Sequence, residues 1–188
     1  MKHFIRFSAG ISAVAHLFVI HPASAASSIT FACELETLKQ ERARNYPHLM
    51  LTSIARTESG RKLPVRKLKV AWPWSINVHG HGFQFETKAT AVAVVKYLLN
   101  NNVRSIDVGC MQVNLKHHPT AFKTIEQAFD PAANVDYAAT FLGQLLHQYG
   151  TWRSAVSHYH SDDPNRQSKY LFKVVRSWYE IKSQHLVD

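Results

Sequence analysis

The sequence predicts an α+β fold that is predominantly α-helical and contains one β-hairpin. Apolar residues recur at helical spacing over most of the chain beyond residue 30, whereas residues 67–86 show a strand-like pattern around a glycine-rich turn. Proline, glycine and asparagine residues separate these segments, as they do at the ends of helices. Without an N-terminal leader about 160 residues remain, which is the usual size of one domain with one core.

Two helices are predicted before the hairpin, over Phe31–Asn45 and His48–Ser59. Pro47 separates them, and Gly60 is well placed to end the second. Apolar side chains at helical spacing should form the inner face of each helix. They are Leu35, Leu38 and Ala43 in the first helix, and Leu49, Met50, Ile54 and Ala55 in the second.

The hairpin is predicted over residues 67–86, which read KLKVAWPWSINVHGHGFQFE, with HGHG as the turn between two strands. Four more helices are predicted after it, because Pro131 suits a first helical position and Gly150 a residue just past a helix end. These four helices are Thr87–Asn100, Pro131–Tyr149, Trp152–Tyr159 and Pro164–Ile181.

The first residues have the pattern of a secretory leader. Lys2 and Arg6 precede the apolar stretch Ile11–Ile20, which is followed by small residues in an A-x-A pattern. The stretch is short for a membrane span, which needs about 20 apolar residues. We therefore expect residues 1–25 to be a signal peptide and residues 26–188 to be a single exported, periplasmic domain without stable membrane insertion. An uncleaved anchor is the alternative.

The chain is basic, with 22 Lys and Arg residues against 13 Asp and Glu residues. Removal of Lys2 and Arg6 with the leader leaves 20 basic against 13 acidic residues, a net charge of +7. Such a surface favours an anionic partner, which outside the cytoplasm means cell wall, membrane headgroups or an acidic protein. The sequence contains no nucleic-acid-binding motif, so we expect no nucleic-acid partner.

Two cysteines, Cys33 and Cys110, lie beyond the leader. An even number of cysteines in an exported chain favours a disulfide, which would tie the first helix to the segment around residue 110. Two separate buried thiols are the alternative, since the sequence does not give the geometry that a disulfide requires.

One acidic residue, Glu58 in the run LTSIARTESG, lies in the last turn of the second predicted helix. The helix dipole disfavours a carboxylate at that end. A solvated side chain at a frayed helix end is one interpretation. The other is a carboxyl at the lip of a cleft, where the dipole and partial burial raise its pKa and keep it protonated near neutral pH, as a general acid requires.

Residues 105–118 read SIDVGCMQVNLKHH, an apolar run that Asp107, Gln112 and Asn114 interrupt. Polar groups are costly to bury without partners. The two amides are either satisfied by backbone groups around a turn at Gly109 or act as donors that line a substrate groove. The run by itself leaves both interpretations open.

Three ordered blocks resemble the signature of the soluble lytic transglycosylase family, E-S-G, G-x-M-Q-[IV]-N and A-[VL]-x-x-Y-[NH]. They are Glu58-Ser59-Gly60, the run GCMQVN over residues 109–114 and the run AVSHYH over residues 155–160. The resemblance covers nearly the whole chain beyond the leader. It implies a lysozyme-like fold, similar to goose-type lysozyme, with the β-hairpin as an insertion beside the active-site cleft. The small single-domain members associated with secretion, conjugation or pilus machines are the most similar.

The resemblance implies one catalytic residue, Glu58, and a set of substrate-binding residues. That set is Ser59, Met111, Gln112, Asn114 and Tyr159. Met111 would lie on the apolar wall of the cleft. Tyr159 would approach Glu58 and hydrogen-bond its carboxyl or the substrate, unless it is a core tyrosine. Ser59 would help to fix the glutamate or would cap local backbone.

At two positions within the blocks this chain has a residue other than the one that is common in the family. Leucine is common in the family where this chain has Cys110, and asparagine is common where it has His160. The histidine pairs His79 and His81, and His117 and His118, lack the spacing of a structural zinc site. We therefore expect no metal and no cofactor.

The reaction that the resemblance implies is a non-hydrolytic cleavage of peptidoglycan glycan strands. Glu58 would protonate the oxygen between N-acetylmuramic acid and N-acetylglucosamine, and the muramoyl C6 hydroxyl would close a 1,6-anhydro ring. Most glycosidases use two carboxylates instead, and Asp107 and Glu86 are the nearby candidates for a second one. A lysozyme-like hydrolase is therefore the main alternative, and a non-catalytic wall-binding assembly factor is another.

Overall fold

The computed structural model describes residues 29–64 and 68–184, and the predicted signal peptide lies outside them. The helices are α2 (Ala32–Arg44), α3 (Met50–Ser59), α4 (Lys88–Asn100), α5 (Ile125–Ala128), α6 (Pro131–Tyr149), α7 (Trp152–His160) and α8 (Pro164–Gln184). The strands are β1 (Gly60–Lys62), β2 (Lys69–Ala71), β3 (Ser75–Val78), β4 (His81–Gln84), β5 (Ile106–Val108) and β6 (Val113–Asn114). The predicted α+β, predominantly helical fold is thus confirmed.

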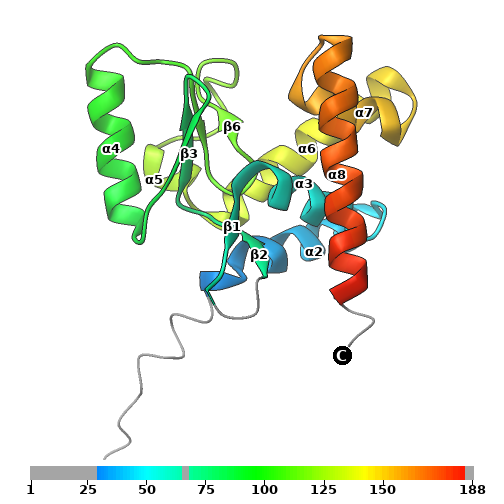
Figure 1. Ribbon diagram of the computed structural model, residues 1–188. Coiled ribbons are helices and arrows are strands. Elements are labelled where there is room, and N and C mark those ends of the chain that lie inside the picture. Colours follow the sequence, from blue (N-terminus) through cyan, green and yellow to red (C-terminus); the bar gives the residue numbers. More distant parts are fainter. Residues whose placement is uncertain (1–28, 65–67, 185–188) are drawn as a thin grey trace, which may run out of the picture.

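The described part of the chain forms two lobes (Figure 1). In the first lobe α2, α3, α6, α7 and α8 pack on one another around a core that includes Leu51, Ile54 and Leu142. In the second lobe α4 and the sheet formed by β3, β4, β5 and β6 enclose a smaller core that includes Ile106 and Phe129. Figure 1 shows α4 and the sheet on one side of the molecule and α7 and α8 on the other. Among the described helices none is long and apolar enough to cross a membrane.

The predicted hairpin is present as β3 and β4, which pair antiparallel with Ile76 opposite Phe83. Its turn is His79-Gly80, where both residues have positive φ, 52° and 83°. The predicted first strand is broken at Trp72-Pro73-Trp74, because proline lacks the N–H that a sheet ladder needs. Residues before the break form β2, which pairs with β1, and residues after it join a sheet of order β4-β3-β5-β6.

Local sequence signals explain the remaining helices. Asp130 caps α6 by accepting a hydrogen bond from Ala133 N, and Pro131 occupies the first turn. Thr87 and Thr151 cap α4 and α7 in the same way. The strands β5 and β6 and the single turn α5 were not expected from the sequence, since they are too short to give a periodic pattern.

The predicted inner face of α2 is wrong. Leu35 is 61% exposed, whereas the buried face consists of Cys33, Glu34, Thr37 and Glu41. The glutamates are buried because they accept hydrogen bonds from neighbouring elements: Glu34 from Ala71 N at 2.8 Å, and Glu41 from Leu49 N at 2.8 Å. Polar partners thus override the apolar pattern.

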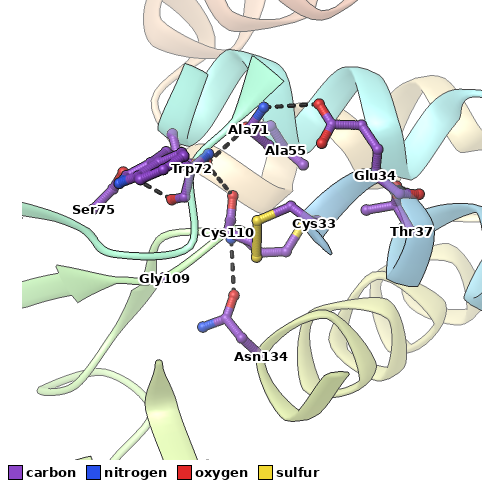
Figure 2. Close-up of a disulfide and its surroundings, with 12 residues drawn as sticks. Cys33, Glu34, Thr37, Ala55, Ala71, Trp72, Ser75, Gly109, Cys110 and Asn134 are labelled. Carbon is purple, nitrogen blue, oxygen red and sulfur yellow. Dashed lines mark hydrogen bonds between the residues drawn. A yellow bond between two sulfur atoms is a disulfide. The ribbon is translucent and has the colours of Figure 1, made fainter. Parts of the chain in front are cut away.

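Cys33 of α2 is disulfide-bonded to Cys110 in the segment after β5 (Figure 2). The bond joins positions 77 residues apart, and both cysteines are fully buried in the helical core. In the chain-entropy model closing a loop of this size stabilises the fold by about 4 kcal/mol. The disulfide therefore fixes the segment around residue 110 against α2.

Candidate active site

Glu58 is the side chain around which the site is built. It lies in the last turn of α3, one residue before the helix ends, and is half-buried. The hydroxyl of Tyr170, which is buried in α8, donates a hydrogen bond to Glu58 Oε1 at 2.6 Å. The carboxyl is therefore held between the helical lobe and the cleft and is not a solvated group at a frayed helix end.

The surroundings of Glu58 raise the pKa of its carboxyl from 4.5 to about 7. Burial is the largest cause, and the nearby Asp107 carboxylate raises the pKa further. The Tyr170 hydrogen bond and the positive charges of Lys173 and Lys69 act in the opposite direction. A carboxyl with this pKa stays partly protonated near neutral pH, so it is suited to general acid catalysis.

Two cavities meet at Glu58. The larger, of about 480 Å³, is lined by β6, α6 and α7, and the smaller, of about 370 Å³, by the end of α3 and the β3–β4 hairpin. Glu58, Asn77 and Gln112 line both. A linear polymer that occupies both cavities would pass the carboxyl at the point where they join. The hairpin lies beside this cleft, as the sequence predicts.

The amides of Gln112 and Asn114 are satisfied within the protein. Gln112 Nε2 donates to Ser75 O at 3.1 Å and to Gly109 O at 3.0 Å. Asn114 Nδ2 donates to Asp107 Oδ1 at 2.7 Å and to Ser105 Oγ at 3.1 Å. Both side chains still line the larger cavity. The donors are thus used to hold the strand ends and Asp107 in place, which favours the structural interpretation of these amides.

The turn between β5 and β6 depends on Gly109. Its φ is +82°, and a Cβ atom there would lie 2.3 Å from Asn134 Nδ2. Asn134 is fully buried and bridges the turn: it donates to Val108 O at 3.0 Å and accepts from Met111 N at 2.9 Å. This arrangement sets the position of Gln112 beside Glu58.

A comparison with protein-family models identifies the chain. The model of the transglycosylase SLT domain matches residues 37–170, more than half of the chain, and includes all three signature blocks. The chain belongs to the transglycosylase SLT domain family. It is accordingly a lytic transglycosylase, an enzyme that cleaves the glycan strands of peptidoglycan. No curated protein and no solved structure matches the chain.

Two residues of this SLT domain lie differently from what the sequence predicts. Met111 has no exposed surface and packs in the helical core, so it is not on the cleft wall; its neighbours Cys110 and Asn134 turn the segment inward. Tyr159 lines the larger cavity, but its hydroxyl donates to Met111 O at 2.9 Å. The hydrogen bond to Glu58 comes instead from Tyr170 of α8.

Ser59 joins three parts of the SLT domain immediately beside the acid. Its hydroxyl donates to Cys110 O at 2.7 Å and accepts from Trp72 N at 3.2 Å. Its carbonyl accepts from Gln84 Nε2 at 2.9 Å. The end of α3 is thereby tied to the disulfide segment, to the residue after β2 and to the hairpin, which restrains the backbone that carries Glu58.

The sequence does not predict the hydrogen bond from Tyr170 to Glu58. The signal for it is the place of Tyr170 on the buried face of α8, 112 residues after Glu58.

The larger cavity is also lined by four histidines, His117, His118, His158 and His160. In the part of the chain that the structure describes, no group of three or more His, Cys, Asp and Glu side chains gathers closely enough to hold a metal ion.

Proposed function

We propose that the chain cleaves the β-1,4 bond between N-acetylmuramic acid and N-acetylglucosamine without water and leaves a 1,6-anhydro-N-acetylmuramic acid end. The observation that carries this proposal is Glu58: one carboxyl at the junction of two cavities, with a pKa raised to about 7. A group whose pKa lies near the working pH can release a proton and take one back within one turnover.

In the proposed reaction Glu58 first gives its proton to the bridging oxygen, and the bond from that oxygen to the muramoyl C1 breaks. The Glu58 carboxylate then takes the proton of the muramoyl C6 hydroxyl. Oxygen O6 attacks C1 and closes the anhydro ring. Glu58 ends the cycle protonated, and no water is consumed. The Tyr170 hydroxyl, 2.6 Å from Glu58 Oε1, would hold the carboxyl in one orientation through both proton transfers.

The strand would lie across both cavities, with sugars on each side of Glu58. Ser59, Gln112, Asn114 and Tyr159 line this path, and Phe83, which is 51% exposed, offers an aromatic face in the smaller cavity. Because the donors of Gln112, Asn114 and Tyr159 are bonded within the protein, we propose that these residues shape the groove and hold its backbone. Met111 supports them from the core.

A lysozyme-like hydrolase is the second candidate, and one observation favours it. Asp107 lines the same cavity as Glu58, and burial raises the pKa of its carboxyl from the ordinary value. A hydrolase uses a second carboxylate to activate water or to act as the nucleophile. Against this role, Asp107 is already engaged by Asn114 at 2.7 Å.

We also propose that the enzyme acts in the periplasm after export and opens the wall locally for a secretion, conjugation or pilus machine. The leader pattern of residues 1–25 supports export. The Cys33–Cys110 disulfide supports an oxidising compartment. Peptidoglycan, the substrate of the family, lies outside the cytoplasmic membrane.

The test of the catalytic role is Glu58→Gln, with Glu180→Gln as the matched control on the exposed face of α8. We expect Glu58→Gln to keep the circular dichroism spectrum and to sediment with purified peptidoglycan. Its rate of peptidoglycan clearing should fall by more than the roughly 10²–10⁴-fold that is lost when a group that only assists proton transfer is removed. Glu180→Gln should clear at the wild-type rate. A folded Glu58→Gln protein that clears peptidoglycan at a near-normal rate would exclude Glu58 as the acid.

A further inference from the structure

His160 connects the larger cavity to the catalytic carboxyl through one aromatic ring. It is the last residue of α7, and its imidazole lies flat on the Tyr170 ring, with the centroids 4.4 Å apart and the planes inclined by 4°. The Tyr170 hydroxyl in turn donates a hydrogen bond to Glu58 Oε1 at 2.6 Å. The side chain of His160 is otherwise exposed and lines the cavity.

We propose that His160 is a positioning residue for the catalytic acid, holding the Tyr170 ring in the orientation in which its hydroxyl reaches Glu58. This inference rests on the proposed role of Glu58. A phenol that donates to a carboxyl must keep both its ring plane and its hydroxyl direction, and a flat aromatic neighbour restricts the ring on the side that faces the cavity.

The charge state of His160 agrees with this role. Burial lowers the pKa of its imidazole, and the positive charges of Lys173 and Arg166 on α8 lower it further. The other titratable groups that line the same cavity come from α3, β5, α6, α7 and the loops after β6 and α7: Glu58, Asp107, His117, His118, Tyr137, His158, Tyr159 and Asp162. A neutral imidazole stacks on the phenol without placing a positive charge beside Glu58. Such a charge would favour the carboxylate and leave a smaller fraction of Glu58 protonated.

The same helix contains a matched control. His158 stacks on Tyr149, with the centroids 3.6 Å apart and the planes inclined by 10°, and it also lines the larger cavity. His158 Nδ1 is bonded to Ser154 O at 2.8 Å. This second stack has no hydrogen bond to Glu58, so its loss should not change the protonation of the acid.

The test compares pH profiles of kcat for peptidoglycan cleavage by His160→Ala, His160→Phe and His158→Ala, with and without Tyr170→Phe. In His160→Ala the Tyr170 hydroxyl is held less firmly, so its hydrogen bond lowers the pKa of Glu58 by a smaller amount. The basic limb of the pH profile of kcat should therefore move upward by about 0.5 to 1 pH unit. At neutral pH kcat should fall by about 3- to 10-fold. His160→Phe keeps the stack and should retain the wild-type limb and at least half of kcat. His158→Ala should leave the limb unchanged.

In the Tyr170→Phe background the His160→Ala change should have no further effect on the limb, because His160 acts through the hydroxyl that is now absent. The inference is overturned if His160→Ala shifts the limb equally in both backgrounds, if it does not shift it at all, or if His160→Phe behaves like His160→Ala. Activity of Glu58→Gln reports separately on the proposed function: an inactive Glu58→Gln with an unshifted His160→Ala removes this inference alone.

Discussion

Glu58 should weaken the fold at neutral and alkaline pH, and Glu58→Gln should remove this effect. The folded protein keeps the carboxyl in a half-buried place where the charged form is disfavoured, so that its pKa is about 7 instead of 4.5. Glutamine has nearly the same shape and retains an oxygen to accept the Tyr170 hydrogen bond, but it does not titrate. The substitution therefore isolates the free energy of ionising this carboxyl in the folded state.

The sign follows from which state holds the proton more tightly. The folded state does, so the contribution of Glu58 to stability is fully present below the unfolded pKa of about 4.5 and is lost as pH rises through the folded pKa of about 7. The complete difference between these pKa values corresponds to about 3 kcal/mol. Since the side chain is partly exposed, we expect about 2 to 3 kcal/mol in the free energy of unfolding.

The assay is urea denaturation of the wild type, Glu58→Gln and the control Glu180→Gln at about pH 4 and about pH 8. At the lower pH the wild type and Glu58→Gln should unfold at nearly the same urea concentration. At the higher pH Glu58→Gln should be more stable by about 2 to 3 kcal/mol, whereas Glu180→Gln should follow the wild type at both. Equal stability of the wild type and Glu58→Gln at both pH values would refute a buried, protonated Glu58.

Two further predictions concern the groups that hold the site. Tyr170→Phe removes the hydroxyl that favours the Glu58 carboxylate, so the basic limb of the pH profile of kcat should move upward by about 1 to 2 pH units; a limb that stays in place would contradict the pKa argument. The double change Cys33→Ser, Cys110→Ser should lower the free energy of unfolding by about 3 to 4 kcal/mol in denaturant titrations. Thiol labelling of the unreduced, denatured wild type should find no reactive thiol, and two labelled thiols would exclude the bridge.

The helices were largely predictable because their ends carry local signals. Pro131 and Gly150 bound α6 at the predicted residues, and Thr87 caps α4 one residue before it begins. The buried face of α2 was not predictable from apolar spacing, because Glu34 and Glu41 are buried by hydrogen bonds to residues of β2 and of the α3 N-terminus. Such partners lie far along the chain, and no local pattern reports them.

In the candidate site, too, local features could be predicted from the sequence and contacts between distant segments could not. Glu58 could be predicted, since its place at the end of α3 and the Glu58-Ser59-Gly60 block are local features. The Tyr170 hydrogen bond could not, because it depends on how α8 packs against α3. Gln112 and Asn114 line the larger cavity, but whether their donors face substrate or protein depends on the backbone of the β5–β6 turn.

The identity of the group that attacks C1 is the central claim, and the product reports it directly. Purified peptidoglycan should be digested with the wild-type enzyme in oxygen-18 water, and the released muropeptides analysed by mass spectrometry. We expect products that end in 1,6-anhydro-N-acetylmuramic acid, lighter by one water than reducing-end products, with no oxygen-18 incorporated. Reducing-end muropeptides that carry oxygen-18 would contradict the account. They would make Asp107 the second carboxylate of a hydrolase, which Asp107→Asn should then inactivate.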